Sequence, residues 1–266
     1  MSGLSSTNGS LSILNKGLSY LDGGLSNINT GLSFVNTPTT GAGFIFTINT
    51  ENLSTGSSNN NQFCLPLHSV GTYNFDIDWG DGNTNTITTW NQAQVTHTYT
   101  SPGIYQITII GTCTGWMFFD NGDGLPIDND KILNISQCGD LILSDTLDLD
   151  SFFYNCSNLT ITATDTLNLT PTQALGLAFF GCTSLTSIPN IQSWDVAGII
   201  DATGMFDGVT LSTTNYSALL NGWAGQAVQN NVTFSGGNST YDSSAITARD
   251  TLVTTYGWTI TDGGLV

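Results

Sequence analysis

The sequence predicts a mainly β protein with three parts: an N-terminal heptad helix, a small β-sandwich, and a short repeat solenoid closed by a small α/β cap. A heptad pattern of leucines fills the N-terminus, alternating strands surround an Asp-Gly turn near residue 80, and one motif recurs 26 residues apart in the C-terminal half. These periods are typical of helix, strand and stacked coils respectively. We therefore divide the chain into residues 1–37, 38–125 and 126–266.

Residues 3–37 divide into five units of seven residues, four of which begin Gly-Leu-Ser. Leucine holds one core position in every unit, and the other is mostly Leu, Ile or Val, so the spacings alternate three and four as in a coiled-coil seam. The apolar core positions are Leu4, Leu11, Leu14, Leu18, Leu21, Leu25, Ile28, Leu32 and Val35. A lone helix would leave this stripe in water, so we expect the segment to oligomerise or to be anchored against a partner.

Glycine weakens this predicted helix. Each glycine at the start of a unit costs about 1 kcal/mol relative to alanine in a helix interior, so the helix should form only where its stripe is buried. Mixed residues at the second core position do not specify a dimer, and a trimer is our first choice. The alternative is a disordered leader rich in Gly, Ser and Asn with accidental periodicity. Pro38 breaks any helix and marks a hinge.

The middle part is predicted as strands from the alternation of apolar and polar residues. Phe75, Ile77 and Trp79 point to one face of a strand, and Asp81-Gly82 follows as a tight hairpin turn because glycine accepts positive φ. A Pro-Gly turn at Pro102 precedes the next alternating run. The further strands that we expect are residues 43–50, 63–67, 104–109 and 115–119.

The two alternating runs carry a combined motif whose members are Asp78, Trp79, Gly80, Asp81, Gly82, His97, Tyr99, Pro102, Gly103 and Tyr105. This motif resembles the PKD-type immunoglobulin-like domain over about residues 40–112. The resemblance implies a small β-sandwich that serves for spacing and adhesion at cell surfaces. It also implies a structural hydrogen-bonding role for His97.

The C-terminal half repeats itself. Phe153 to Leu159 reads Phe-Tyr-Asn-Cys-Ser-Asn-Leu, Phe179 to Leu185 reads Phe-Phe-Gly-Cys-Thr-Ser-Leu, and a weaker copy covers residues 205–211. Strand-like pieces at residues 144–149 and 164–169 precede the first two copies. Residue types that recur at fixed positions of the repeat predict a solenoid in which every coil buries one face on the next. These positions are held by Cys156, Leu159, Cys182 and Leu185.

These units are similar to the BspA-like leucine-rich repeat, whose signature is aromatic-x-x-Cys-x-x-Leu, followed in some copies by a Trp-Asp strand such as residues 191–196. The end of the chain fits the same family, which implies helices over residues 216–223 and 245–256 and strands over residues 232–237 and 258–264. Together the two resemblances cover about residues 40–264 and imply a surface protein.

The charge balance excludes several classes of partner. There are 20 acidic residues against only Lys16, Lys131 and Arg249, giving a net charge of −17. Such a chain cannot neutralise a phosphate backbone or approach an anionic membrane favourably, so we expect no nucleic acid. No stretch approaches the roughly 18 apolar residues of a membrane span.

The five cysteines form no Cys-x-x-Cys pair, which argues against zinc and thioredoxin-type sites. We interpret all five as small buried core residues, with disulfides as the alternative. With only His68 and His97 available, the parts of a Ser-His-Asp or zinc hydrolase are missing. A pair of carboxylates assembled by folding would still allow a glycosidase, which we rank low.

We expect no cofactor and no metal, with calcium as a weak alternative. Its candidate ligands are Asp120, Asp123, Asp128 and Asp130, which miss the EF-hand spacing and read first as turn residues. Exposed tryptophans would stack on sugars. We interpret four of the tryptophans as core residues, namely Trp116, Trp194, Trp223 and Trp258. Trp90 is the best candidate for exposure.

These observations favour a non-enzymatic virion spike or fibre protein of a bacterial virus. Residues 1–37 would bind a capsid or base protein, and the distal repeats would contact a glycan or protein of the host surface. The N-terminus has no basic start or continuous apolar run, so we expect no secretory signal and a location on the virion surface. The alternatives are an extracellular adhesin on a bacterial cell surface and, below it, a carbohydrate-active enzyme.

Overall fold

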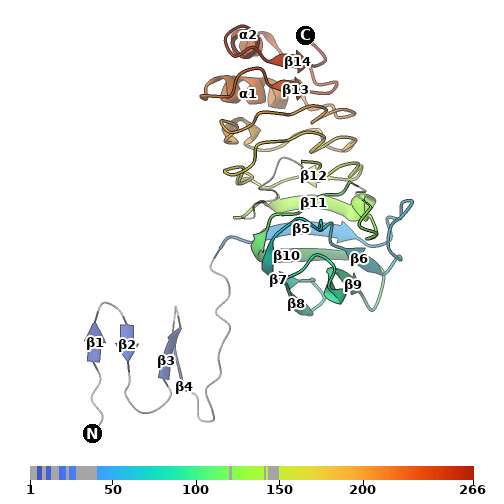
Figure 1. Cartoon of the computed structure of the whole chain (residues 1–266), viewed down its shortest axis with the longest axis vertical. Coiled ribbons are helices and arrows are strands. Elements are labelled where there is room, and N and C mark those ends of the chain that lie inside the picture. Colours follow the sequence, from blue (N-terminus) through green and yellow to red (C-terminus); the bar gives the residue numbers. More distant parts are fainter. Residues whose placement is uncertain are drawn as a thin grey trace. The chain divides into compact units, whose positions relative to one another are not determined.

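The computed structural model describes residues 41–119, 122–140, 142 and 150–266, together with the backbone of four short strands within residues 5–27. The chain forms two compact units, residues 1–38 and residues 39–266, which we call unit one and unit two. The described chain is mainly β with a mixed sheet, as the sequence predicts (Figure 1).

The described strands of unit one form two antiparallel pairs. β1 (Ser5–Thr7) pairs with β2 (Ser10–Ser12), and β3 (Leu18–Leu21) pairs with β4 (Gly24–Asn27). The predicted heptad helix over residues 3–37 is therefore not confirmed. The residues between the paired strands read Asn-Gly and Asp-Gly, which favour hairpin turns and compete with the heptad signal. The side chains of the predicted seam, from Leu4 to Val35, lie outside the described residues.

Unit two begins with a six-stranded sheet in the order β12-β11-β5-β10-β7-β8. All pairs are antiparallel except β11 with β12, which makes the sheet mixed. The strands are β5 (Phe44–Asn49), β7 (Tyr73–Asp78), β8 (Thr84–Ile87), β10 (Ile104–Cys113), β11 (Ile132–Gln137) and β12 (Thr160–Ile161). A second small sheet pairs β6 (Gln62–Cys64) with β9 (Thr96–Thr98), after the 3₁₀ turn η1 (Ala93–Val95).

These strands form where apolar and polar residues alternate, as the sequence predicts. In β5 every second residue is fully buried, beginning with Phe44, Phe46 and Ile48. The strand predicted over residues 115–119 is not a named strand, because only a single bridge joins Trp116 to Leu67. Trp116 is nevertheless fully buried, and its ring meets Phe44 edge to face at 5.4 Å between centroids.

The predicted boundary at residue 125 falls inside unit two. After the 3₁₀ turn η2 (Asn129–Lys131), β11 pairs along β5, with irregularities in register, and β12 then pairs with β11. β11 covers an edge of β5 that would otherwise present unpaired backbone groups. The sheet therefore continues directly into the repeat half of the chain.

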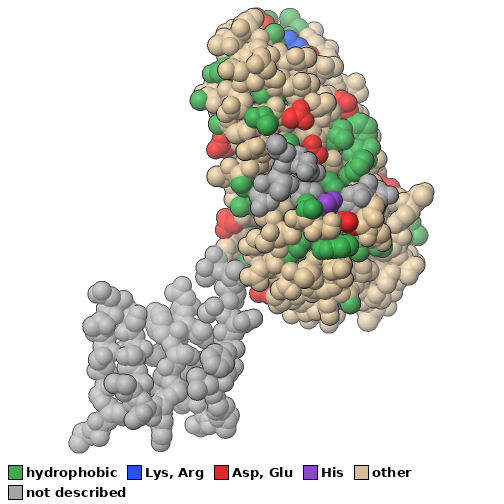
Figure 2. Space-filling model, viewed as in Figure 1, with side chains coloured by type: hydrophobic (Ala, Val, Ile, Leu, Met, Phe, Trp, Pro, Cys, Tyr) green, Lys and Arg blue, Asp and Glu red, His purple; other side chains and the backbone are tan. Residues whose placement is uncertain are grey.

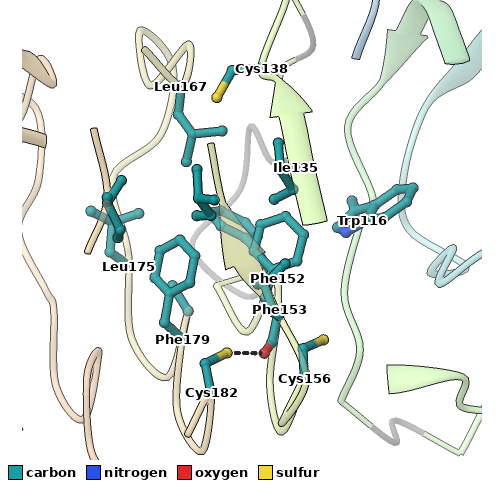
Figure 3. Packing of buried hydrophobic residues seen from close by; sticks show 14 of the residues in the cluster. Trp116, Ile135, Cys138, Phe152, Phe153, Cys156, Leu167, Leu175, Phe179 and Cys182 are labelled. Atoms are coloured by element: carbon teal, nitrogen blue, oxygen red, sulfur yellow. Dashed lines mark hydrogen bonds between the residues drawn. The ribbon is translucent and has the colours of Figure 1, made fainter. Parts of the chain in front are cut away.

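From residue 150 onward, successive stretches of 26 or 27 residues lie side by side (Figure 1). The Phe153 amide donates to the Ala178 carbonyl at 2.8 Å, and the Phe179 amide donates to the Met205 carbonyl at 3.0 Å. The rings of Phe153, Phe179 and Phe206 stack at 5.5 Å between neighbouring centroids. Figure 3 shows Phe153 and Phe179 packed next to the turns that carry Cys156 and Cys182. Neighbouring coils thus share backbone hydrogen bonds and one aromatic stack.

A left-handed turn residue recurs in each of these coils. Asn155, Gly181 and Gly208 have φ of 54°, 70° and 80°. Glycine, and less often asparagine, adopts this region at low cost. A Cβ on Gly181 would lie 2.2 Å from Oδ1 of Asn155, so a side chain at this position would have to displace that amide of the adjacent coil.

Two predicted strands of the repeat half have other structures. Residues 164–169 form no named strand, although Leu167 and Leu169 are buried. The Trp-Asp strand predicted over residues 191–196 is instead the 3₁₀ turn η3 (Ile191–Ser193). The strand predicted over residues 144–149 lies outside the described residues.

The C-terminal elements match the prediction closely. Helix α1 (Thr213–Ala224) starts at Ser212, whose hydroxyl accepts from the Asn215 amide at 3.3 Å, and it buries Leu219, Leu220 and Trp223. β13 (Thr233–Ser235) pairs in parallel with β14 (Thr259–Thr261), and η4 (Ser243–Ala245) leads into α2 (Ile246–Thr254). Neither of these helices has the length and apolarity needed to cross a bilayer, and no other helix of the described residues does.

Candidate functional site

The PKD-like motif residues gather into one stack of rings beside the β7 turn. The His97 ring lies on Trp79 at 4.7 Å between centroids, Tyr99 meets His97 edge to face at 4.5 Å, and Tyr105 stacks on Tyr99 at 3.8 Å. Nε2 of His97 lies 2.8 Å from Oδ2 of Asp81, and the Tyr99 hydroxyl donates to the Trp79 carbonyl at 3.2 Å. His97 therefore makes the structural hydrogen bond that the motif implies.

The turn after β7 is fixed by its own side chains. Oδ1 of Asp78 accepts from the Gly80 amide at 2.9 Å, and Gly80 and Gly82 have φ of 79° and 89°. A Cβ on Gly80 would lie 2.2 Å from the carbonyl oxygen of Gln106, so no other residue fits there. Burial alone would raise the pKa of Asp81, but the hydrogen bonds from His97 and Asn83 outweigh it and hold the pKa below its usual value.

The second motif turn ties β10 to the end of β5. The Gly103 amide, next to Pro102, donates to the Thr50 hydroxyl at 2.9 Å, and the Thr50 amide donates to the Gly103 carbonyl at 2.9 Å. All ten motif residues thus serve turns and ring packing. We assign them to folding rather than to binding.

A buried cation holds the loop before β6. Lys131 is 0% exposed, and its ammonium lies 2.7–3.1 Å from five oxygens: both the carbonyl and the hydroxyl of Ser58, the carbonyls of Asn59 and Gln62, and Oδ1 of Asp128. Burial lowers the pKa of this ammonium, and Asp128 opposes that effect. The oxygens take the place of the water that a charged lysine normally keeps.

The carboxylate of Asp128, one of the weak calcium candidates, is engaged by this network. Asp128 is 1% exposed, and its carboxylate accepts from the Ser58 amide, the Ser58 hydroxyl and the Cys64 amide at 2.8, 2.6 and 2.7 Å. The sequence hypothesis of a calcium ligand is replaced here by an ion pair with Lys131. An isolated lysine in a loop gives no sign of burial, so the partner was missed.

The other calcium candidates serve separate contacts. Asp123 accepts from the Ser69 amide at 2.9 Å and lies 3.9 Å from Nε2 of His68, while Asp130 accepts from the Ser157 hydroxyl at 2.5 Å. Asp120 lies outside the described residues. Within the described ranges, no group of three or more His, Cys, Asp or Glu side chains could hold a metal ion.

The cysteines are core side chains, as predicted. Cys156 and Cys182 are 0% exposed, and Leu159 and Leu185 beside them are buried. Sγ of Cys182 donates to the Phe153 carbonyl of the preceding coil at 3.0 Å (Figure 3). Burial raises the pKa of the Cys182 thiol to about 12, so it carries no reactive thiolate. All five thiols are free, and the disulfide alternative is wrong.

Four of the five tryptophans weighed above are core residues, as expected. Trp116, Trp194, Trp223 and Trp258 are buried, whereas Trp90 is half-buried against the core. Sequence reasoning identified these positions correctly because each lies in an apolar run or helix face. The tryptophans therefore supply no exposed platform for sugars, apart from part of Trp90.

The second cation of unit two is also engaged. Nε of Arg249, on α2, donates to Oδ2 of Asp262 at 2.8 Å, and the Tyr216 hydroxyl donates to the same carboxylate at 3.0 Å. The guanidinium lies 5.4 Å from the centre of the Tyr241 ring. The side chain of Asp262 is 3% exposed, so this group of residues ties the two helices of the cap to the residues after β14.

The surface of unit two is therefore acidic. Asp22 and Lys16 are the charged residues of residues 1–38 and cancel each other, so the whole net charge of −17 belongs to unit two. Both cations of that unit are held by carboxylates, Lys131 in the interior and Arg249 on α2. Figure 2 shows red carboxylates spread over the visible face and blue atoms near its C-terminal end.

One exposed feature escaped the sequence reasoning. Phe119 is 43% exposed and meets Tyr154 edge to face at 5.0 Å, and Tyr154 stacks on Phe180 at 4.9 Å with an interplanar angle of 11°. We call these three residues the aromatic column. The signal for it was a pair of adjacent aromatic residues at 118–119, 153–154 and 179–180: the first ring of each pair is buried in the core, and the second is less buried.

No protein-family model, curated protein or solved structure matches the chain.

Proposed function

We propose that the protein is a non-enzymatic spike or fibre protein on the surface of a bacterial virus, anchored through residues 1–37 and attaching to the host through unit two. The observation that carries this proposal is the division of the chain. A neutral, leucine-periodic leader adjoins a compact β unit on which the net charge of −17 is concentrated. One part is suited to assembly, and the other is suited to display in water.

Within unit two, we assign residues 40–112 to a PKD-like sandwich and residues 126–266 to a BspA-like leucine-rich-repeat solenoid with an α/β cap. The first assignment is supported by the ring stack around His97 and the Asp81 contact. The second is supported by backbone hydrogen bonds and stacked phenylalanine rings that join residues 25–27 positions apart in the chain. The two parts share one hydrophobic core.

Charge supports the division of labour. Copies of unit two repel one another at low salt, because each carries a large net charge of one sign. The leader, with no net charge, meets no such barrier to packing against copies of itself or against a capsid protein. We therefore place the contacts of a trimer in residues 1–37, with the acidic units held apart from one another.

The buried thiols favour a virus particle over an exported adhesin. All five cysteines are free and packed as core side chains. This fits folding in a reducing cytosol, where virus particles are assembled, because thiols in exported proteins are exposed to oxidising conditions during folding.

Immunogold electron microscopy tests the proposal. An antibody raised against residues 39–266 should label the outer surface of virus particles purified from a producing culture. Antibody pre-absorbed with the same residues is the control and should label nothing. Label on the surface of uninfected cells, together with virus particles that carry no label, would contradict the proposal and favour the adhesin.

A further inference from the structure

The aromatic column is not needed to fill the core. Its members follow Phe118, Phe153 and Phe179 in the chain, and those three inner rings are at most 2% exposed. The inner rings already complete the packing between coils, with centroid separations of 5.5–6.4 Å. Of the rings at 119, 154 and 180, Phe119 is 43% exposed, and Tyr154 and Phe180 are half-buried beside a finished core. Contiguous apolar surface of this kind marks an interaction site in soluble proteins.

A small cavity adjoins the column at Phe119. Its apolar lining includes Pro66, Met117, Leu125 and Pro126, and Asp123 is its charged member. The cavity has a volume of about 30 Å³. A site for one water needs roughly 10–15 Å³ on the same measure, so this space suits the end of one aliphatic side chain rather than a whole ligand.

One carboxylate lines the cavity, and two more belong to the turns of the coils that carry the column. Asp123 lines the cavity, and Asp207 takes the place of an aromatic residue in the coil after Phe180, where its carbonyl accepts from the Gly181 amide at 2.8 Å. Asp130 lies in the turn that holds Ser157. Figure 2 shows hydrophobic and acidic side chains next to each other on the face it presents.

We propose that the aromatic column and its cavity bind a basic polypeptide segment of a host surface protein, with one aliphatic side chain in the cavity and lysines or arginines beside it. Charge complementarity selects this occupant, because unit two has a net charge of −17 and its own cations are paired. The inference rests on the attachment function proposed above and names the class of partner.

Two other occupants fit the geometry less well. A second copy of the chain would bring another net charge of −17 to the same surface. A neutral sugar packs its C–H groups on the face of an aromatic ring, but Tyr154 and Phe180 stack on each other and cover the faces between them. Ring edges carry partial positive charge and suit carbonyl oxygens and aliphatic groups of a peptide.

The test is fluorescence anisotropy with the full chain and a labelled peptide of alternating lysine and leucine. Binding should weaken about tenfold or more in Phe119→Ser and in Tyr154→Ser, as for central apolar residues of an interface. Val253→Ser is the matched control, since Val253 is 36% exposed on α2, outside the column. It should bind as the wild type does. Phe119 is exposed, so its substitution leaves the fold intact, and thermal unfolding of each variant checks this.

Three probe comparisons complete the experiment. Replacing every leucine of the peptide by serine, or every lysine by glutamate, should abolish binding, and maltoheptaose should not compete. Equal binding by Phe119→Ser and the wild type would show plain charge attraction and overturn the proposal. Competition by maltoheptaose would overturn it in favour of a glycan. If the peptide does not bind while virus particles still carry the protein on their surface, the proposed docking site is wrong and the proposed function stands.

Discussion

At the scale of residues, buried polar groups decide what holds unit two together. Lys131 and Asp128 form an ion pair that is closed off from water and shared with backbone oxygens. Nothing in the sequence distinguishes this lysine from a surface one, since burial depends on a loop folded over it from 69–73 residues away. The role of His97 was predictable because a whole motif, rather than one residue, pointed to it.

Lys131→Met should destabilise the protein by about 3–5 kcal/mol, because it leaves the carboxylate of Asp128 buried without its cation. The double variant Lys131→Met with Asp128→Asn should lose less than the sum of the single variants, since the two residues interact directly. Urea unfolding followed by tryptophan fluorescence measures these losses. Additive losses in the double variant would contradict the ion pair.

The Asp81 and His97 contact predicts a pH dependence. The pKa of Asp81 is lowered in the folded state, so the unfolded chain takes up the proton first as the pH falls. The stability from this carboxylate is present above its unfolded pKa, near 4, and is lost as the pH drops through the folded value. Asp81→Asn should remove that part of the acid sensitivity in thermal unfolding between neutral and acidic pH. Asp250→Asn, on the exposed side of α2, should retain the wild-type pH profile.

At the scale of elements, local pattern predicted the strands of the sheet well, but long-range pairing overrode it elsewhere. The alternation in β5 and β7 is visible in the sequence and was confirmed, and the two cap helices that the repeat resemblance implied are present as α1 and α2. The piece at residues 164–169 looked like a strand, yet it has no ladder of hydrogen bonds to a neighbour. In the leader, two hairpin dipeptides competed with the heptad period, and the described residues there are strands.

The recurring left-handed turn yields a prediction about coil stacking. Gly181→Ala should cost about 1–2 kcal/mol for the backbone alone, plus the displacement of Asn155, whose Oδ1 lies 2.2 Å from the new Cβ. Gly56→Ala is the matched control, because Gly56 has φ of 86° and nothing within 4 Å of its Cβ position. Chemical denaturation should show a clearly larger loss for Gly181→Ala. Equal losses would mean that the coils do not meet at this turn.

At the scale of the whole molecule, one core runs through unit two from β5 to the C-terminal cap. The predicted boundary at residue 125 came from a change of motif, and motifs do not reveal which strand completes a sheet. β11 belongs to the repeat half by sequence but pairs along β5. The aromatic column was also not predicted from the sequence, because the exposure of its rings depends on how the coils stack.

Unit two should unfold as one cooperative block. A chain ending at residue 125 lacks β11, so one edge of β5 is left without its partner strand. It also lacks the buried side chains of Ile132 and Ile135, so it should not fold to a stable monomer. Calorimetry of residues 39–266 should give a single transition with matching calorimetric and van't Hoff enthalpies. Two separate transitions, or a stable fragment ending at residue 125, would show two independent domains.

We propose that the neutral leader assembles the protein while the acidic unit remains separate from its copies. Sedimentation equilibrium of the full chain beside residues 39–266, at micromolar concentration and physiological salt, tests it most directly. We expect a trimer for the full chain and a monomer for residues 39–266. A monomeric full chain, or equal association of both, would contradict it.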